Sequence, residues 1–174
     1  PAVSAAAPTA GLHLTEPLLE EITEAGVELA RIQLEVGLAT FTPIRSATIE
    51  AHAMHAERYQ IPEAAADQIR RARSVGGRVV AVGTTAVRCL ESRPDGQGGV
   101  LAGAGETDLY LRPGSRFQVV DGLLTNFHQP RSSLLVLVSA FFGEQTIRRA
   151  YRDALGRGYR FLSFGDCMFG WRRE

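Results

Sequence analysis

Three segments of the chain carry apolar residues at the i, i+3, i+4 spacing of an amphipathic helix. The first begins at Thr15, which can cap it, and ends at Gly26, the second begins at Pro62, and the third ends at Gly156 and Gly158. Their apolar faces consist of Leu18, Leu19 and Ile22, of Ala65, Ala66, Ile69 and Ala72, and of Ile147, Ala150, Tyr151, Ala154 and Leu155. The pattern therefore predicts three helices that each bury one face.

Short apolar runs between these helices predict strands. They lie in VELARIQLEV (27–36), RVVAVG (78–83), RFQVVDGLLTNFH (116–128) and YRFLSFG (159–165). The glycine-rich stretch 93–106 lacks apolar periodicity and any GxGxxG or Walker spacing, and we predict a surface loop there. Helices that alternate with strands favour an α/β fold, namely a layered α/β/α sandwich with a mixed, largely parallel sheet, formed by one domain over residues 1–174.

Composition narrows the class of protein. The formal net charge is zero, and all 19 basic side chains other than histidine are Arg. Residues 143–174 hold seven Arg against four acids, which could attract phosphates, although solvated helix faces explain most of these charges more simply. Cys89 and Cys167 are far apart, so neither a disulfide framework nor a zinc site is indicated. Without a membrane-length apolar run or a signal-peptide pattern, we expect a soluble cytoplasmic protein with no membrane partner.

All four histidines lie in short segments outside the predicted helices, and histidine is the first candidate for acid or base chemistry near neutral pH. His52, His55 and Glu57 also raise the question of a metal ion. On a strand the two histidines would point to opposite faces, whereas a helix would bring them together. A metal site is the less favoured interpretation, so no metal ligands are predicted, and a metal-dependent hydrolase is kept as an alternative.

The junction between the strand of 78–83 and the next helix is a candidate anion site. Thr84 and Thr85 begin this helix, where free backbone N–H groups suit a carboxylate or phosphate, and ligands of open α/β sheets gather at such strand ends. A Thr-capped helix with no ligand fits the same residues equally well. Arg88, one turn further on, either pairs with Glu91 or Glu57 or clamps an anion.

Six groups of residues occur in an order that resembles a known family. They are PTAGLH (8–13), VGLATF (36–41) with MHAERY (54–59), AVGTTAVRCLES (81–92), TDLYLRPG (107–114), VVDGLLTNFHQPRSSLLVLVSAF (119–141), and AY (150–151) with YRFLSFGDCM (159–168). Together they resemble the C-terminal portion of the S-adenosylmethionine:tRNA ribosyltransferase-isomerases of queuosine synthesis. The resemblance covers almost the entire chain, and the ordered series is far more specific than any one motif.

The resemblance implies an activity and an architecture. Such an enzyme transfers and isomerises the ribosyl moiety of S-adenosylmethionine to 7-aminomethyl-7-deazaguanine in tRNA, and it releases adenine and methionine as epoxyqueuosine forms. The partners expected are therefore tRNA and S-adenosylmethionine, the latter as co-substrate, with no further cofactor. The family's α/β domain is interrupted by a smaller β-barrel domain, which is absent here, so the resemblance implies a C-terminal fragment of a larger two-domain enzyme.

Roles for individual residues follow only from this resemblance. The expected catalytic residues are His128 or His13 as base or proton shuttle and Asp121 as a group that stabilises the sulfonium, with aromatic faces such as Phe127 as the alternative for that role. The expected substrate-binding residues are Gly11, His55, Thr84, Thr85, Arg88, Asn126 and Asp166, with Thr84, Thr85 and Arg88 on the methionine carboxylate and Asn126 on adenine or the acceptor base. Considered without the resemblance, Asp121 and Asp166 each follow an apolar run beside glycine, where aspartate is typical of turns.

The chain also departs from the family pattern at three positions. Glu35 stands where the family usually has His, Ala39 where it has Gly, and Arg131 where it has Lys. The Glu35 difference removes a hydrogen-bonding ring and adds a carboxylate. A paralogue that acts on another acceptor, and a fragment that binds S-adenosylmethionine or RNA without chemistry, therefore remain alternatives.

Overall fold

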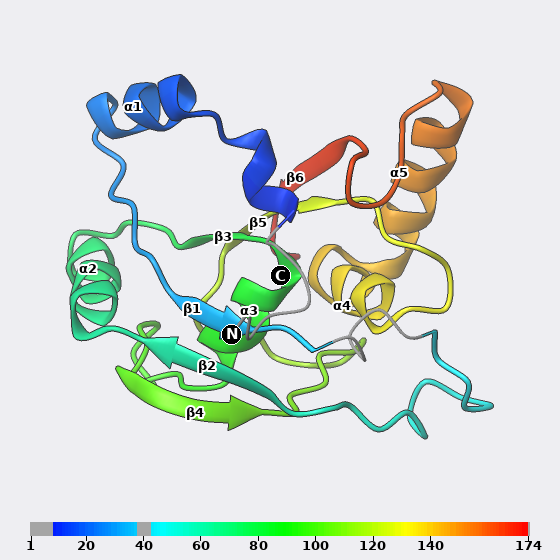
Figure 1. Ribbon diagram of the computed structural model, residues 1–174, viewed down its shortest axis with the longest axis horizontal. Helices are drawn as coiled ribbons and strands as arrows, with labels where there is room; N and C mark the ends of the chain where they lie inside the picture. The colour runs from blue at the N-terminus through cyan, green and yellow to red at the C-terminus, as the bar shows by residue number, and fades with distance from the viewer. Residues whose placement is uncertain (1–8, 38–42, 174) are drawn as a thin grey trace.

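The computed structural model describes residues 9–37 and 43–173 (Figure 1). Ala39, one of the departures from the family pattern, lies outside these ranges. The elements are, in chain order, η1 (Thr9–His13), α1 (Glu16–Glu24), β1 (Gln33–Glu35), β2 (Glu57–Ile61), α2 (Glu63–Ser74), β3 (Val80–Val82), α3 (Thr84–Glu91), β4 (Gly103–Thr107), β5 (Gly122–Asn126), α4 (Ser133–Phe142), α5 (Glu144–Gly156) and β6 (Cys167–Trp171).

The six strands in the described part of the chain form two three-stranded sheets. One has the order β1-β2-β4 and is antiparallel throughout, and the other has the order β3-β5-β6. In the second sheet β3 runs parallel to β5, whereas β6 returns antiparallel to β5. The predicted α/β class is confirmed, but the expectation of one largely parallel sheet is wrong. Among the described strands only the β3–β5 pair, which α3 and the chain after it connect, has the crossover that parallel strands need.

Helix α3 is the centre of the fold. In Figure 1 it lies between the two sheets, with α2 on one side and α4 and α5 on the other. Val87, Cys89 and Leu90 of α3 are buried in the same apolar cluster as Ile61 of β2 and Leu123 of β5. One continuous core therefore spans both sheets, and it holds the first turn of α3 in a defined place relative to each of them.

The three predicted helices are confirmed as α1, α2 and α5, but α1 does not bury the face that its pattern predicts, because none of its residues is buried and Leu18 is 37% exposed. Helix α2 starts after Pro62 and buries Ala65, Ala66 and Ile69, as its periodicity predicts. In α5 the predicted apolar face is narrower than expected, because Leu155 is 67% exposed. The periodicity did not predict α4, because its sequence SLLVLVSAFF is apolar nearly all round. No helix within the described ranges has both the length and the hydropathy needed to span a membrane.

Two predicted segments differ in the structure. Residues 103–106 of the supposed surface loop belong to β4, where Gly105 lies under the Tyr59 ring and a Cβ at Gly105 would be 2.7 Å from Tyr59 Oη. Residues 159–165 are turns instead of a strand, with Gly165 N donating to Leu162 O and Leu162 at a φ of 70°. The last strand begins two residues later, at Cys167. In both cases a contact with another part of the chain is present, namely the Tyr59 ring over Gly105 and the Leu162 backbone N–H that donates to Phe127 O at 2.9 Å.

Candidate functional site

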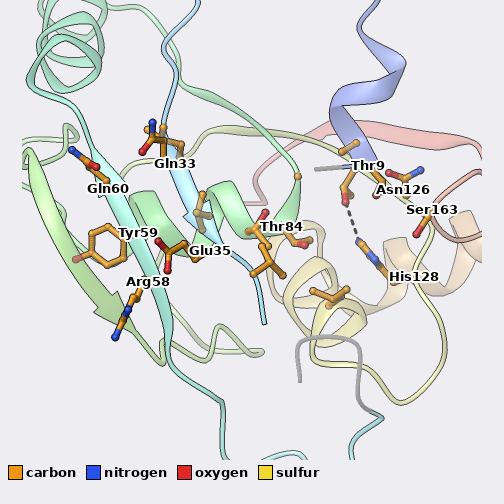
Figure 2. A pocket seen from close by; sticks show the side chains of 18 of the residues that line it. Thr9, Gln33, Glu35, Arg58, Tyr59, Gln60, Thr84, Asn126, His128 and Ser163 are labelled. Carbon is orange, nitrogen blue, oxygen red and sulfur yellow. Dashed lines mark hydrogen bonds between the residues drawn. The ribbon is translucent and has the colours of Figure 1, made fainter. Parts of the chain in front are cut away.

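A cavity of about 1050 Å³ lies between the two sheets, at the carboxyl ends of β3 and β5 (Figure 2). One wall consists of side chains from β1, β2 and β4, and the other consists of the first turn of α3, the end of β5 and the residues that follow it. This is where ligands of α/β sheets bind most often, because the chain leaves each strand there in a loop or helix start. The cavity is the candidate functional site.

The first turn of α3 forms the middle of the cavity. Gly83 has a φ of 93°, which the left-handed region allows glycine, and its N–H donates to Leu124 O. This turn redirects the chain from β3 into α3, so that Thr84 and Thr85 both line the cavity. Thr84 is buried, and neither threonine side chain caps the helix. The first backbone N–H groups of α3 therefore lie beside the cavity with the positive end of the helix dipole.

His128 and Thr125 form a pair at the end of β5. The Thr125 hydroxyl lies 3.0 Å from His128 Nε2, and the His128 backbone N–H donates to Tyr151 Oη at 2.8 Å. Burial lowers the pKa of His128 to about 4 and raises the pKa of Tyr151 to about 12. The imidazole is therefore neutral at pH 7, and one of its ring nitrogens carries a lone pair.

Asn126, the last residue of β5, links three segments around the cavity. Its Nδ2 lies 3.1 Å from His13 Nε2 of η1 and donates to the carbonyl oxygen of Leu162 at 3.2 Å. Because Nδ2 is the donor in this pair, His13 Nε2 accepts and its proton lies on Nδ1. His13 does not itself line the cavity, whereas Thr9 and Ala10 of the same 3₁₀ helix do. The structure thus places His13 behind Asn126.

The opposite wall is more polar and more exposed. Glu35, Arg58 and Glu106 form a row across β1, β2 and β4, because Glu35 pairs in register with Arg58 and Arg58 with Glu106. Arg58 Nε lies 3.0 Å from Glu106 Oε1, and a hydrogen bond and the charge of Glu106, with a smaller effect of Glu35, raise the pKa of Arg58. With two carboxylates and one guanidinium, the row carries a formal charge of −1 at neutral pH.

Arg88 does not lie at the cavity. Its guanidinium is 2% exposed and pairs with Glu57, and it also donates to the carbonyl oxygens of Leu109 and Thr107. Burial lowers the pKa of Arg88, and the charge of Glu57 opposes this effect. Of the alternatives considered for Arg88, the structure shows the pair with Glu57, and an anion clamp at this position would need the pair to break.

The two aspartates occupy structural positions. Asp121 accepts from the Val79 backbone N–H at 2.8 Å and pairs with Arg73 at 2.7 Å, at the end of β5 that is remote from Asn126. Asp166 accepts from the Arg160 backbone N–H at 2.7 Å within the turns that precede β6. Neither lines the cavity, and both have the turn or strand-end contacts that aspartate commonly makes.

Gly11 and His55 also lie outside the cavity lining. Gly11 is half-buried in η1, and His55 is exposed just before β2. Over the residues that the structure describes, no group of three or more His, Cys, Asp or Glu side chains is arranged to hold a metal ion. Glu57, the carboxylate in the metal alternative, faces Arg88.

The cavity also includes residues that sequence reasoning did not propose for it. They are chiefly Arg58, Tyr59 and Gln60 of β2, together with Thr125, Leu162 and Ser163. The only local indication was that Thr125 sits between an apolar run and Asn126. Residues of β2 reach the cavity because of pairing with β1 and β4, which no local pattern indicates.

The relatives found by comparison with known proteins carry the same name. The model of the family described as "Queuosine biosynthesis protein" matches residues 1–169. The chain is 55% identical over 171 residues to the S-adenosylmethionine:tRNA ribosyltransferase-isomerase of Anaeromyxobacter dehalogenans, covering 98% of this chain and 49% of that protein. It is 56% identical over 165 residues to the enzyme of the same name from Moorella thermoacetica, covering 95% and 48%.

A solved structure agrees with this likeness. The crystal structure of S-adenosylmethionine tRNA ribosyltransferase from Thermotoga maritima superposes with a TM-score of 0.75 at 42% identity, covering 92% of this chain and 50% of that one. The chain thus spans about half the length of the relatives that it matches. Since the family model covers nearly all of its residues, the chain belongs to the queuosine biosynthesis protein family.

Proposed function

We propose that this protein acts in the transfer and isomerisation of the ribosyl moiety of S-adenosylmethionine to 7-aminomethyl-7-deazaguanine in tRNA, giving epoxyqueuosine, adenine and methionine. The observation that carries the proposal is the likeness, at 55% and 56% identity, to proteins named S-adenosylmethionine:tRNA ribosyltransferase-isomerase. The cavity supports it, because about 1050 Å³ is ample for a nucleoside co-substrate together with part of an acceptor.

The two walls of the cavity suit different parts of the reaction. The N-terminus of α3, with Thr84 and Thr85, offers N–H donors and hydroxyls to the methionine carboxylate of S-adenosylmethionine. The row of Glu35, Arg58 and Glu106 carries a net negative charge that suits the cationic aminomethyl group of the acceptor. On this assignment the Glu35 carboxylate contributes to acceptor binding, in place of the histidine that is usual in the family.

His128 is the proposed proton carrier. The sulfonium acidifies the adjacent 5′ carbon, and loss of that proton requires a base within reach. A ring whose pKa is about 4 has its lone pair free at pH 7 but does not retain a proton, so His128 acts as a relay that passes the proton on. Thr125, at 3.0 Å from Nε2, is the adjacent hydroxyl for this relay, and the departing adenine, which needs one proton to leave as a neutral base, is the final acceptor. His13 is a positioning residue, because its Nε2 already accepts from Asn126.

Adenine release tests the proposal directly. Purified protein is incubated with S-adenosylmethionine and tRNA bearing 7-aminomethyl-7-deazaguanine, and adenine and methionine are measured by chromatography. Both products should appear, and replacement of His128 by Ala should slow their release by about 10²-fold or more. His52→Ala is the matched control, since His52 is half-buried, contacts Tyr110 and does not line the cavity.

The outcomes separate the alternatives. Binding of S-adenosylmethionine without release of either product would contradict ribosyl transfer to this acceptor and would favour a paralogue or a binding function. Normal release by the His128→Ala variant would contradict the relay while leaving the proposed reaction intact.

A further inference from the structure

The side-chain oxygen of Asn126 is a buried hydrogen-bond acceptor without a partner. Asn126 is 4% exposed, and its Oδ1 has no hydrogen-bond partner in the part of the chain that the structure describes. The amide nitrogen of the same side chain has two partners, His13 Nε2 and Leu162 O. Because a carbonyl oxygen can only accept, the contact with Leu162 assigns the nitrogen to that side and leaves Oδ1 on the other.

The surroundings of Asn126 hold the amide in this orientation. Leu162 adopts a φ of 70°, which is unfavourable for a leucine, and its backbone N–H donates to Phe127 O at 2.9 Å while its carbonyl oxygen accepts from Asn126. Two hydrogen bonds therefore brace a strained loop residue against the end of β5. A braced amide cannot turn to satisfy its oxygen elsewhere.

A buried acceptor that is left without a partner costs free energy, so its persistence in a braced side chain calls for a donor other than the residues that the structure describes. Asn126 lines the cavity, together with Leu162 and Phe127. The donor that fits is an N–H group of a planar heterocycle, because such a group can enter the cavity edge-on and give up its hydrogen bonds to water for one to Oδ1.

We propose that Asn126 Oδ1 accepts a hydrogen bond from the 6-amino group of the adenine in S-adenosylmethionine, and that it selects adenine over a 6-oxo purine. This inference rests on the proposed function and adds a specificity-determining residue to it. Adenine is favoured over the tRNA base as the occupant because Asn126 is almost fully buried and a free co-substrate reaches that depth without bringing a polynucleotide backbone with it. A 6-oxo purine would place an acceptor opposite Oδ1 and would be rejected.

A pair of ligands tests the inference on the unaltered protein. S-adenosylmethionine and its 6-oxo analogue S-inosylmethionine are titrated calorimetrically into the protein, with and without an anticodon stem-loop bearing 7-aminomethyl-7-deazaguanine. The 6-oxo analogue should bind about 10- to 100-fold more weakly, the range expected when a buried hydrogen bond is lost and an acceptor is left opposed. Asn126→Leu should bind both ligands with equal, low affinity, and thermal unfolding checks that this variant is folded.

The possible results of these titrations separate the inference about Asn126 from the proposed function. Equal affinity of the unaltered protein for the two ligands would overturn the inference and leave the proposed function standing. Equal affinities together with loss of stem-loop binding in Asn126→Leu would assign Oδ1 to the acceptor base instead and would likewise overturn it. A protein that binds neither ligand under either condition would overturn the proposed function itself, whereas a clear preference for adenine without product release would support the inference and contradict the reaction.

Discussion

Replacement of Arg88 by Met tests whether this arginine stabilises the fold or binds a ligand. The side chains of Arg88 and Glu57 are each 2% exposed and form an ion pair, and the guanidinium also donates to two backbone carbonyl oxygens near β4. Methionine keeps much of the aliphatic stem but removes the charge and the donors. Glu57 would then lose its cationic partner in the interior, where an ionised carboxylate is strongly disfavoured.

The expected loss of stability is large. Removing one member of a buried ion pair costs about 3–5 kcal/mol, and a domain of this size loses about 2–4 °C in Tm per kcal/mol, so the Tm should fall by roughly 6–20 °C. The double variant Glu57→Met with Arg88→Met should recover most of this loss, because it leaves no unpaired charge. The control Arg157→Met removes the exposed pair with Asp153, whose side chains are 69% and 64% exposed, and should cost at most about 1 kcal/mol.

Thermal and urea unfolding followed by circular dichroism measure the changes in Tm and in the free energy of unfolding, and calorimetric titration of S-adenosylmethionine measures binding in the same variants. An Arg88→Met protein with unchanged stability but much weaker binding of S-adenosylmethionine would refute the structural role and would favour the hypothesis that Arg88 clamps an anion. A double variant as unstable as the single one would show that packing of the stem, and not the pair, is the source of the stability.

Two further predictions concern stability. Because burial lowers the pKa of His128 from 6.5 to about 4, the folded protein resists protonation, and its free energy of unfolding should fall by about 3 kcal/mol from this group as the pH drops from 6.5 to 4. Urea titrations at several pH values should show this loss in the parent but not in His128→Gln, and equal pH dependence in both would contradict it. Gly105→Ala would place a Cβ 2.7 Å from the Tyr59 hydroxyl and should lower the free energy of unfolding by about 1–3 kcal/mol. The control Gly156→Ala, whose Cβ would have nothing within 4 Å, should be neutral or slightly stabilising in thermal unfolding. Similar Tm values for the two variants would contradict the close packing at Gly105.

Local patterns predicted the elements whose formation depends on nearby residues. The spacing of Ala65, Ala66 and Ile69 predicted α2, and the strand-to-helix junction before Thr84 predicted the start of α3 and a candidate anion site, whose Thr84 lines the cavity. The direction of strand pairing could not be predicted in this way, because it depends on which strands meet after the whole chain folds. Strand β4 could not be predicted for the same reason, since a glycine at position 105 is explained only by the Tyr59 ring that covers it.

The same difference between local patterns and contacts of distant segments applies to the candidate site. The resemblance to the family predicts Asn126 and His128 as site residues, and in the structure both line the cavity at the end of β5. The choice between Glu57 and Glu91 as partner of Arg88 could not be made, because Glu57 lies 31 positions away and Glu91 only one turn away. In the structure Glu91 accepts instead from backbone N–H groups before β5, including that of Val119 at 3.0 Å.

The charges of the two walls are consistent with the order of events that the proposed reaction needs. A sulfonium cation in the cavity would be repelled by an imidazolium, and a pKa of about 4 keeps His128 neutral at pH 7. In the proposed reaction the cationic acceptor amine would meet the net negative row of Glu35, Arg58 and Glu106 on the other wall. Burial thus keeps positive charge away from the wall that we propose for proton loss, and exposed carboxylates supply negative charge on the wall that we propose for the acceptor. Glu35→Arg changes the formal charge of that row from −1 to +1. This variant should therefore raise the KM for the acceptor far more than it raises the Kd for S-adenosylmethionine.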